Sequence, residues 1–101
     1  MSNFIQFPAR GEILGQLAAL DYSGHWHNRF CEELATRLDS RVYDSAAFTF
    51  VLTEILYEHT EDEVEEGPEV VADVILALTH DRQLAIAALQ TLDEIEALIA
   101  A

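Results

Sequence analysis

Lysine is absent from this chain of 101 residues, and arginine supplies all five of its basic side chains. Nineteen aspartates and glutamates leave a formal net charge of -14. Such an imbalance repels nucleic acids and anionic membrane surfaces, and it attracts basic proteins over long distances. No basic patch with interleaved aromatic residues offsets it, so direct binding of nucleic acid is the function that the composition opposes most strongly.

Other absences narrow the class of protein. There is one cysteine, Cys31, so no internal disulfide can form and nothing indicates an oxidising compartment. No apolar run approaches the roughly 18 residues that a membrane-spanning helix needs, and the first ten residues hold no apolar signal-peptide region. A glycine-rich phosphate loop is also missing. We therefore predict a soluble cytoplasmic protein with no cofactor.

Half of the residues are apolar, which predicts a folded chain despite the charge, and the length suits one domain with a modest core. Residues 1–10 are predicted to form an extended arm, because Pro8 disfavours helix at Phe7. The apolar residues of this arm either pack against the body or fray with the terminus. Residues 11–101 are predicted to form a single helical domain.

Apolar residues spaced three and four apart predict about five helices in this domain. The predicted ranges are 11–20, 24–39, 45–60, 68–79 and 82–99. Ser23, Asp44 or Ser45, and Asp81 are candidate caps, and Pro68 fits the first turn of the fourth helix. No strand or hairpin signal is apparent, so the sequence predicts an all-α bundle with short connections, an acidic loop and an extended N-terminal arm.

Two of these helices have features that bear on function. In the second, Arg29 can pair with Glu33, and Glu33 with Arg37, so the scarce positive charge is concentrated near this helix. The fifth helix has apolar residues around more than one face. This pattern predicts that it is either central to the bundle or covered by a second protomer.

An acidic stretch fills the middle of the forty residues between Arg41 and Arg82, which contain no basic residue other than histidine. Its candidate partner-binding carboxylates are Glu54, Glu58, Glu61, Asp62, Glu63, Glu65, Glu66, Glu69 and Asp73. If the third helix continued through Glu65, carboxylates one turn apart would form a stripe, and the fourth helix would repeat the spacing. Like charges so spaced cost about 0.2–0.5 kcal/mol per pair. Because the arginines lie elsewhere in the chain, we expect this charge to be poorly neutralised.

Two interpretations of the stretch remain open. A charge run is usually a solvated loop that confers solubility. Alternatively, the stretch presents negative charge to the Lys/Arg-rich site of a nucleic-acid-binding protein and imitates phosphates. A carboxylate every helical turn recurs about every 6 Å, against one phosphate per ~3.4 Å of each DNA strand. The clusters within residues 61–66 would have to supply the difference.

The function predicted first is therefore inhibition: the chain binds a basic protein surface and blocks nucleic acid from it. The alternative is a helical dimerisation or adaptor module, which uses the apolar fifth helix and keeps the acidic loop for solubility. In size, acidity and helical character the chain resembles the small acidic proteins that phages use to inhibit host defence, including DNA-mimic and anti-CRISPR proteins. That resemblance extends over the whole chain without a shared motif, and it assigns no residue. It implies the cytoplasm of a bacterium and a gene carried by a phage or another mobile element.

Candidates for chemistry are few. His27 and Cys31 are one turn apart and share a helix face, which makes them half of a zinc site if His59 or His80 is brought near. The same pair could act as nucleophile and base, but no orienting group follows from the sequence. An EF-hand calcium loop is excluded, because Val64 would occupy a ligand position. We predict neither an enzyme nor a metal site.

Overall fold

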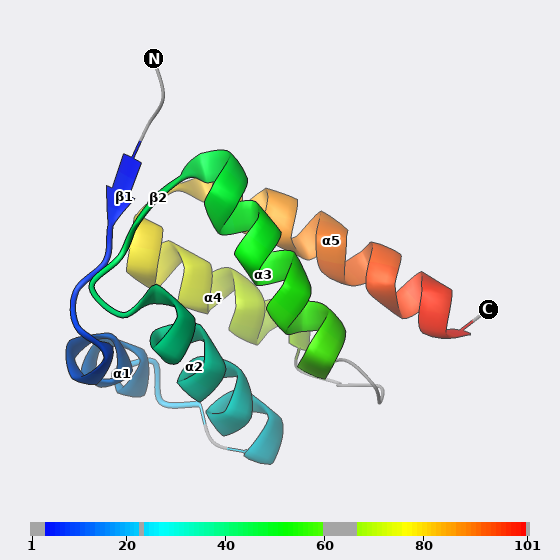
Figure 1. Ribbon diagram of the computed structural model, residues 1–101. Helices are drawn as coiled ribbons and strands as arrows, with labels where there is room; N and C mark the ends of the chain where they lie inside the picture. The colour runs from blue at the N-terminus through cyan, green and yellow to red at the C-terminus, as the bar shows by residue number, and fades with distance from the viewer. Residues whose placement is uncertain (1–3, 23, 60–66, 101) are drawn as a thin grey trace.

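Helices account for 78% of the residues that the computed structural model describes, which confirms the predicted all-α class (Figure 1). The structure describes residues 4–22, 24–59 and 67–100, and these contain five helices. The elements are β1 (Phe4–Gln6), α1 (Arg10–Ala18), α2 (His25–Leu38), β2 (Val42–Asp44), α3 (Ser45–His59), α4 (Gly67–Thr79) and α5 (Arg82–Ala100). Every helix begins and ends within two residues of its predicted bounds.

Side-chain caps explain where α3 and α5 begin. The N–H of Ala47 donates to Asp44 Oδ1 at 2.7 Å, at the start of α3. At the start of α5, the N–H groups of Gln83 and Leu84 both donate to Asp81 Oδ1, at 2.9 and 3.3 Å. Each bond satisfies a backbone N–H that has no partner inside its helix. Asp44 and Asp81 are therefore confirmed as caps.

The first two helices begin without a local side-chain cap. Gly24 occupies the N-cap position of α2 with a φ of 144°, a conformation that glycine adopts without steric cost. Ser23, the predicted cap, lies outside the described residues. At the start of α1, the N–H of Arg10 donates to Asp39 Oδ1 at 2.9 Å. A residue 29 positions later in the chain thus completes the first turn of α1.

Two short strands contradict the prediction that the chain has none. β1 pairs antiparallel with β2, and Ile5 lies opposite Tyr43. Each strand has three residues, too few for an alternating pattern to be recognised in the sequence. Phe7, which follows β1, is buried and stacks on Phe48 with ring centroids 5.4 Å apart, whereas Phe4 is exposed. Of the two alternatives for the arm, packing against the body is the correct one for its described residues.

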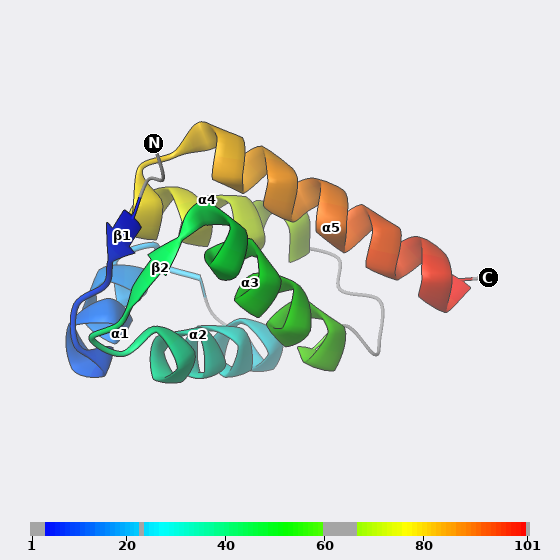
Figure 2. The same ribbon diagram turned by 45° about the horizontal axis from the view of Figure 1, so that its top comes forward.

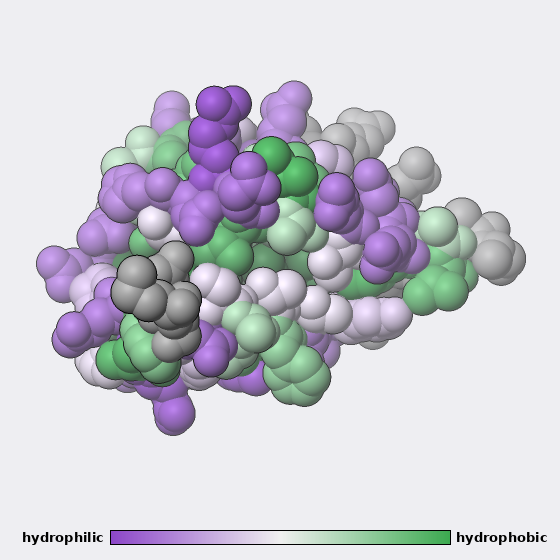
Figure 3. All heavy atoms as spheres, turned by 90° about the horizontal axis from the view of Figure 1, so that it is seen from above, coloured by the Kyte–Doolittle hydropathy of each residue, from purple (hydrophilic) through white to green (hydrophobic). Residues whose placement is uncertain are grey.

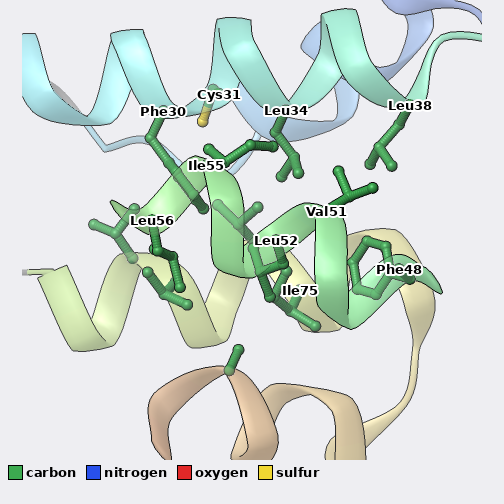
Figure 4. Close-up of a cluster of buried hydrophobic side chains, with 14 of the residues drawn as sticks. Phe30, Cys31, Leu34, Leu38, Phe48, Val51, Leu52, Ile55, Leu56 and Ile75 are labelled. Atoms are coloured by element: carbon green, nitrogen blue, oxygen red, sulfur yellow. The ribbon is translucent and has the colours of Figure 1, made fainter. Parts of the chain in front are cut away.

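Helix α3 lies at the centre of the bundle, between α2 on one side and α4 and α5 on the other (Figures 1 and 2). Figure 4 shows Val51 pointing toward Leu38 of α2, while Leu52 lies near Ile75 of α4. The buried side chains of α3 form a broad face of about 140° around the helix; they are Phe48, Val51, Leu52, Ile55 and Leu56. Full burial of one such side chain contributes about 1.5–3 kcal/mol.

Helix α5 lies along one side of the bundle (Figure 1). It packs against α4 and α3. Its buried residues are Leu84, Ala85, Ala88, Leu92 and Ile95. Ile86 and Leu98, by contrast, are 46% and 64% exposed. The prediction that the fifth helix is central is wrong, because α3 occupies that place; its cover by a second protomer stays a prediction.

Candidate protein-binding surface

Four of the nine predicted carboxylates lie in the described residues, and all four are exposed. Glu54 and Glu58 are in the second half of α3, Glu69 is in the first turn of α4, and Asp73 is at the middle of α4. Figures 1 and 2 show that α3 ends and α4 begins at the same end of the bundle. The other five, together with the predicted continuation of α3, lie outside the described residues: Glu61, Asp62, Glu63, Glu65 and Glu66.

Glu54 has a countercharge that the sequence did not predict. Arg37 Nη2 of α2 lies 3.3 Å from Glu54 Oε1, and this is the one ion pair between described residues. The expected series of pairs from Arg29 through Glu33 to Arg37 therefore does not form, because Arg37 reaches across to α3. Both partners are partly exposed, so the pair adds at most about 1 kcal/mol to stability. The expectation that no arginine neutralises the stretch is wrong at Glu54.

Asp73 lies beside a shallow, open pocket of about 410 Å³. One of its carboxylate oxygens accepts a hydrogen bond from the Tyr22 hydroxyl at 2.5 Å. Glu69 lines the same pocket one helical turn before Asp73. The full set of lining residues is Tyr22, Pro68, Glu69, Ala72, Asp73 and Leu89. Two carboxylates beside apolar side chains suit a cationic group on an aliphatic stem, the chemistry of lysine and arginine.

The helix ends affect these carboxylates differently. Glu58 is in the last turn of α3, where negative charge opposes the helix macrodipole, whereas Glu69 in the first turn of α4 is favoured by it. Each effect amounts to roughly 0.3–1 kcal/mol at an exposed position. The indole N–H of Trp26 donates to the backbone carbonyl of His59, which satisfies one of the free carbonyls at the end of α3. Glu58 thus carries its charge at a small cost to stability.

Two aromatic residues that the sequence analysis did not single out share the outer side of α3 with the carboxylates. Phe50 is 67% exposed and Tyr57 is 54% exposed. At about 100° per residue, Phe50, Glu54 and Tyr57 fall within about 60° of one another around the helix, and Glu58 adjoins them. The buried residues of α3 lie on the opposite side of the helix. The sequence could have indicated this exposure: helical periodicity predicts the apolar face of α3, and neither Phe50 nor Tyr57 falls on that face.

The predicted contact between His27 and Cys31 is present. Cys31 Sγ lies 3.7 Å from the ring nitrogens of His27, and both side chains are buried. Burial raises the pKa of the Cys31 thiol to about 11 and lowers the pKa of His27. The thiol is therefore protonated near neutral pH, which is the opposite of an activated nucleophile.

No third ligand joins this pair. Within the described residues, no three His, Cys, Asp or Glu side chains are grouped so that they could hold a metal ion. His59 is the last residue of α3, and its Nε2 atom is buried without a hydrogen-bond partner in the described part of the chain. His80 follows α4. The described residues thus supply two possible zinc ligands here, His27 and Cys31, and no third.

No protein-family model, curated protein or solved structure matches the chain. Across the described residues, no helix combines the length and the apolar character needed to cross a bilayer. The choice among functions accordingly depends on the chemistry of the surface.

Proposed function

We propose that this protein binds a Lys/Arg-rich surface of another protein and thereby blocks nucleic acid from that surface. The observation that carries the proposal is the lack of countercharge. Five of the 19 carboxylates fall within residues 60–66; among the other fourteen, none is buried and Glu54 alone forms an ion pair with a described residue. Negative charge that is neither buried nor paired is available to a basic partner.

Nucleic-acid-binding sites are the partner class that fits this surface best. Such sites collect Lys and Arg side chains to receive closely spaced negative charge. Glu58 on α3, with Glu69 and Asp73 on α4, presents that charge at one end of the bundle. The pocket beside Glu69 and Asp73 has the chemistry to receive a single basic side chain. The resemblance in character to phage inhibitors supports the same function.

Competition with nucleic acid tests this proposal. The wild-type chain is immobilised and used to capture proteins from a bacterial extract, with and without an excess of a double-stranded oligonucleotide. Two variants remove three carboxylates each: E58Q/E69Q/D73N from the candidate surface and D93N/E94Q/E96Q from α5. We expect the wild type and the α5 variant to retain a nucleic-acid-binding protein that the oligonucleotide displaces, and the surface variant to lose it.

Two results would contradict the proposal. The first is a captured protein that stays bound in the presence of the oligonucleotide. The second is an equal loss of capture in the two triple variants, since this would show that net charge matters and its position does not. Circular dichroism of each variant controls for folding.

A dimerisation or adaptor module is the second candidate, because Ile86 and Leu98 of α5 are exposed. They are separated by about 120° around the helix, so they do not form one continuous patch. Light scattering after size exclusion tests this candidate. A dimer that I86E/L98E dissociates would favour it, and a monomer at micromolar concentration would remove self-association as the function.

A further inference from the structure

The outer side of α3 combines two kinds of exposed group. Phe50 and Tyr57 expose more than half of their surface, although the core accommodates Phe48 in full. Glu54 lies between the two rings along the helix, and Glu58 follows Tyr57 directly. Two helical turns separate the rings, or about 10 Å along the axis.

Figure 3 shows the bundle from above, where α3 and α5 lie side by side with α3 toward the lower edge of the view. Hydrophilic residues gather over α5, whereas intermediate and hydrophobic colours predominate over α3. The exposed side of α3 is thus less hydrophilic than that of α5, although α3 also carries carboxylates. Exposed aromatic rings of this kind are enriched among the residues that dominate protein–protein interfaces.

We propose that the outer side of α3 is the surface on which the protein binds arginine side chains of its partner. A guanidinium group is flat and weakly hydrated, so it stacks on an aromatic ring while its N–H groups donate to a neighbouring carboxylate. Phe50 and Glu54, one helical turn apart, supply one ring and one carboxylate, and Tyr57 follows Glu54 by three residues on the same side of the helix. This inference rests on the proposed function and adds to it the position of the contact and the preferred cation.

The ion pair between Arg37 and Glu54 supports arginine as the ligand of this surface. Arg37 reaches from α2 and places its Nη2 atom 3.3 Å from Glu54 Oε1, so the position of Glu54 already admits a guanidinium group. Glu58 has no ion pair within the described residues. Glu58, one helical turn after Glu54, is therefore open to an arginine of the partner.

Other occupants fit the surface less well. An apolar partner would bury Glu58 without a countercharge, which costs several kcal/mol. A second copy in a twofold arrangement would bring the same carboxylates together, in a chain whose net charge is already -14. An anionic membrane surface would be repelled for the same reason. An arginine-rich protein segment satisfies both the rings and the carboxylates.

Peptide binding tests the inference without knowledge of the natural partner. The probes are fluorescent nine-residue peptides of arginine alone and of lysine alone, and fluorescence anisotropy is measured with the full chain at low and moderate salt. We expect the wild type to bind the arginine peptide more tightly than the lysine peptide. Each exposed cation–π contact is worth about 0.5–1 kcal/mol, or two- to fivefold in affinity. F50A/Y57A should therefore bind the arginine peptide about fivefold more weakly, or worse.

Matched variants distinguish the contribution of the aromatic rings to binding from the contributions of apolar area and of charge. F50L/Y57L keeps the apolar area without the rings, and it should weaken binding as F50A/Y57A does. I86A/L98A removes two exposed apolar side chains from α5 and should bind as the wild type does. E54Q/E58Q should weaken binding more than D93N/E94Q, which removes the same charge from α5.

Three results would overturn the inference: unchanged binding by F50A/Y57A, wild-type affinity in F50L/Y57L, or an equal loss in I86A/L98A. The two proposals fail separately. Unchanged aromatic variants together with oligonucleotide-sensitive capture would overturn the arginine contact and leave the inhibitor function standing. Weakened aromatic variants together with capture that the oligonucleotide does not affect would support the contact and contradict nucleic-acid competition.

Discussion

Helices α3 and α5 are both acidic and apolar, yet they differ in where their exposed apolar residues lie. On α3 the exposed Phe50 and Tyr57 share one side with two carboxylates, whereas on α5 the exposed Ile86 and Leu98 point in different directions. α3 is also buried on two sides, and α5 mainly on one. The comparison shows that negative charge is common on this molecule and that the combination of rings with carboxylates distinguishes α3.

The largest effect expected from this comparison concerns stability. Ile55→Ala empties a fully buried position at the centre of the bundle, so it should lower the free energy of unfolding by about 2–5 kcal/mol. Leu98→Ala on α5, where the side chain is 64% exposed, should change it by less than about 0.5 kcal/mol. Urea unfolding followed by circular dichroism measures both. Similar losses for the two variants would mean that α3 is not the central helix.

A smaller effect is expected at the helix starts. Asp44→Ala and Asp81→Ala each remove a cap and should cost about 0.5–2 kcal/mol of unfolding free energy. Asp81 accepts two backbone N–H groups and Asp44 accepts one, so the loss at α5 should be the larger. Asparagine at either position should recover most of the stability, because its side-chain oxygen also accepts. A greater loss at Asp44 in the same urea measurement would reverse this order.

The smallest expected effect concerns the removal of a positive charge beside α3, compared with the same removal on α5. Arg37→Gln frees Glu54 on α3, so it should improve binding of the arginine peptide by about twofold, the equivalent of roughly 0.5 kcal/mol. The matched control, Arg82→Gln, removes the same charge at the start of α5 and should have less effect. Anisotropy titrations of the two variants provide the measurement. An equal improvement in both would assign the gain to net charge.

Local signals in the sequence were sufficient to predict the helices. Apolar periodicity and the caps Asp44 and Asp81 located α3 and α5, because both signals act within a few residues of one another. The contact between His27 and Cys31 followed from their one-turn spacing for the same reason. The predicted fold class is therefore correct.

Features that depend on tertiary packing were not predictable. The strands are too short to leave a pattern, and β1 pairs with a strand that lies beyond α1 and α2 in the chain. Arg37 had a local partner in Glu33 and paired with Glu54 on another helix. The exposure of Phe50 and Tyr57 depends on which side of α3 its neighbours leave uncovered. Among the groups proposed to bind a partner, the sequence therefore predicted the carboxylates and did not predict the aromatic rings.

The pairing of β1 with β2 also bears on the order in which the chain folds. Gln6 lies opposite Val42, and the first N–H of α1 is satisfied by Asp39. The beginning of the chain is therefore held by residues that are synthesised some thirty to forty positions later. Such distant contacts form late, because closing the intervening loop costs entropy before any contact is gained. Residues 4–10 should thus be among the last of the described residues to become ordered.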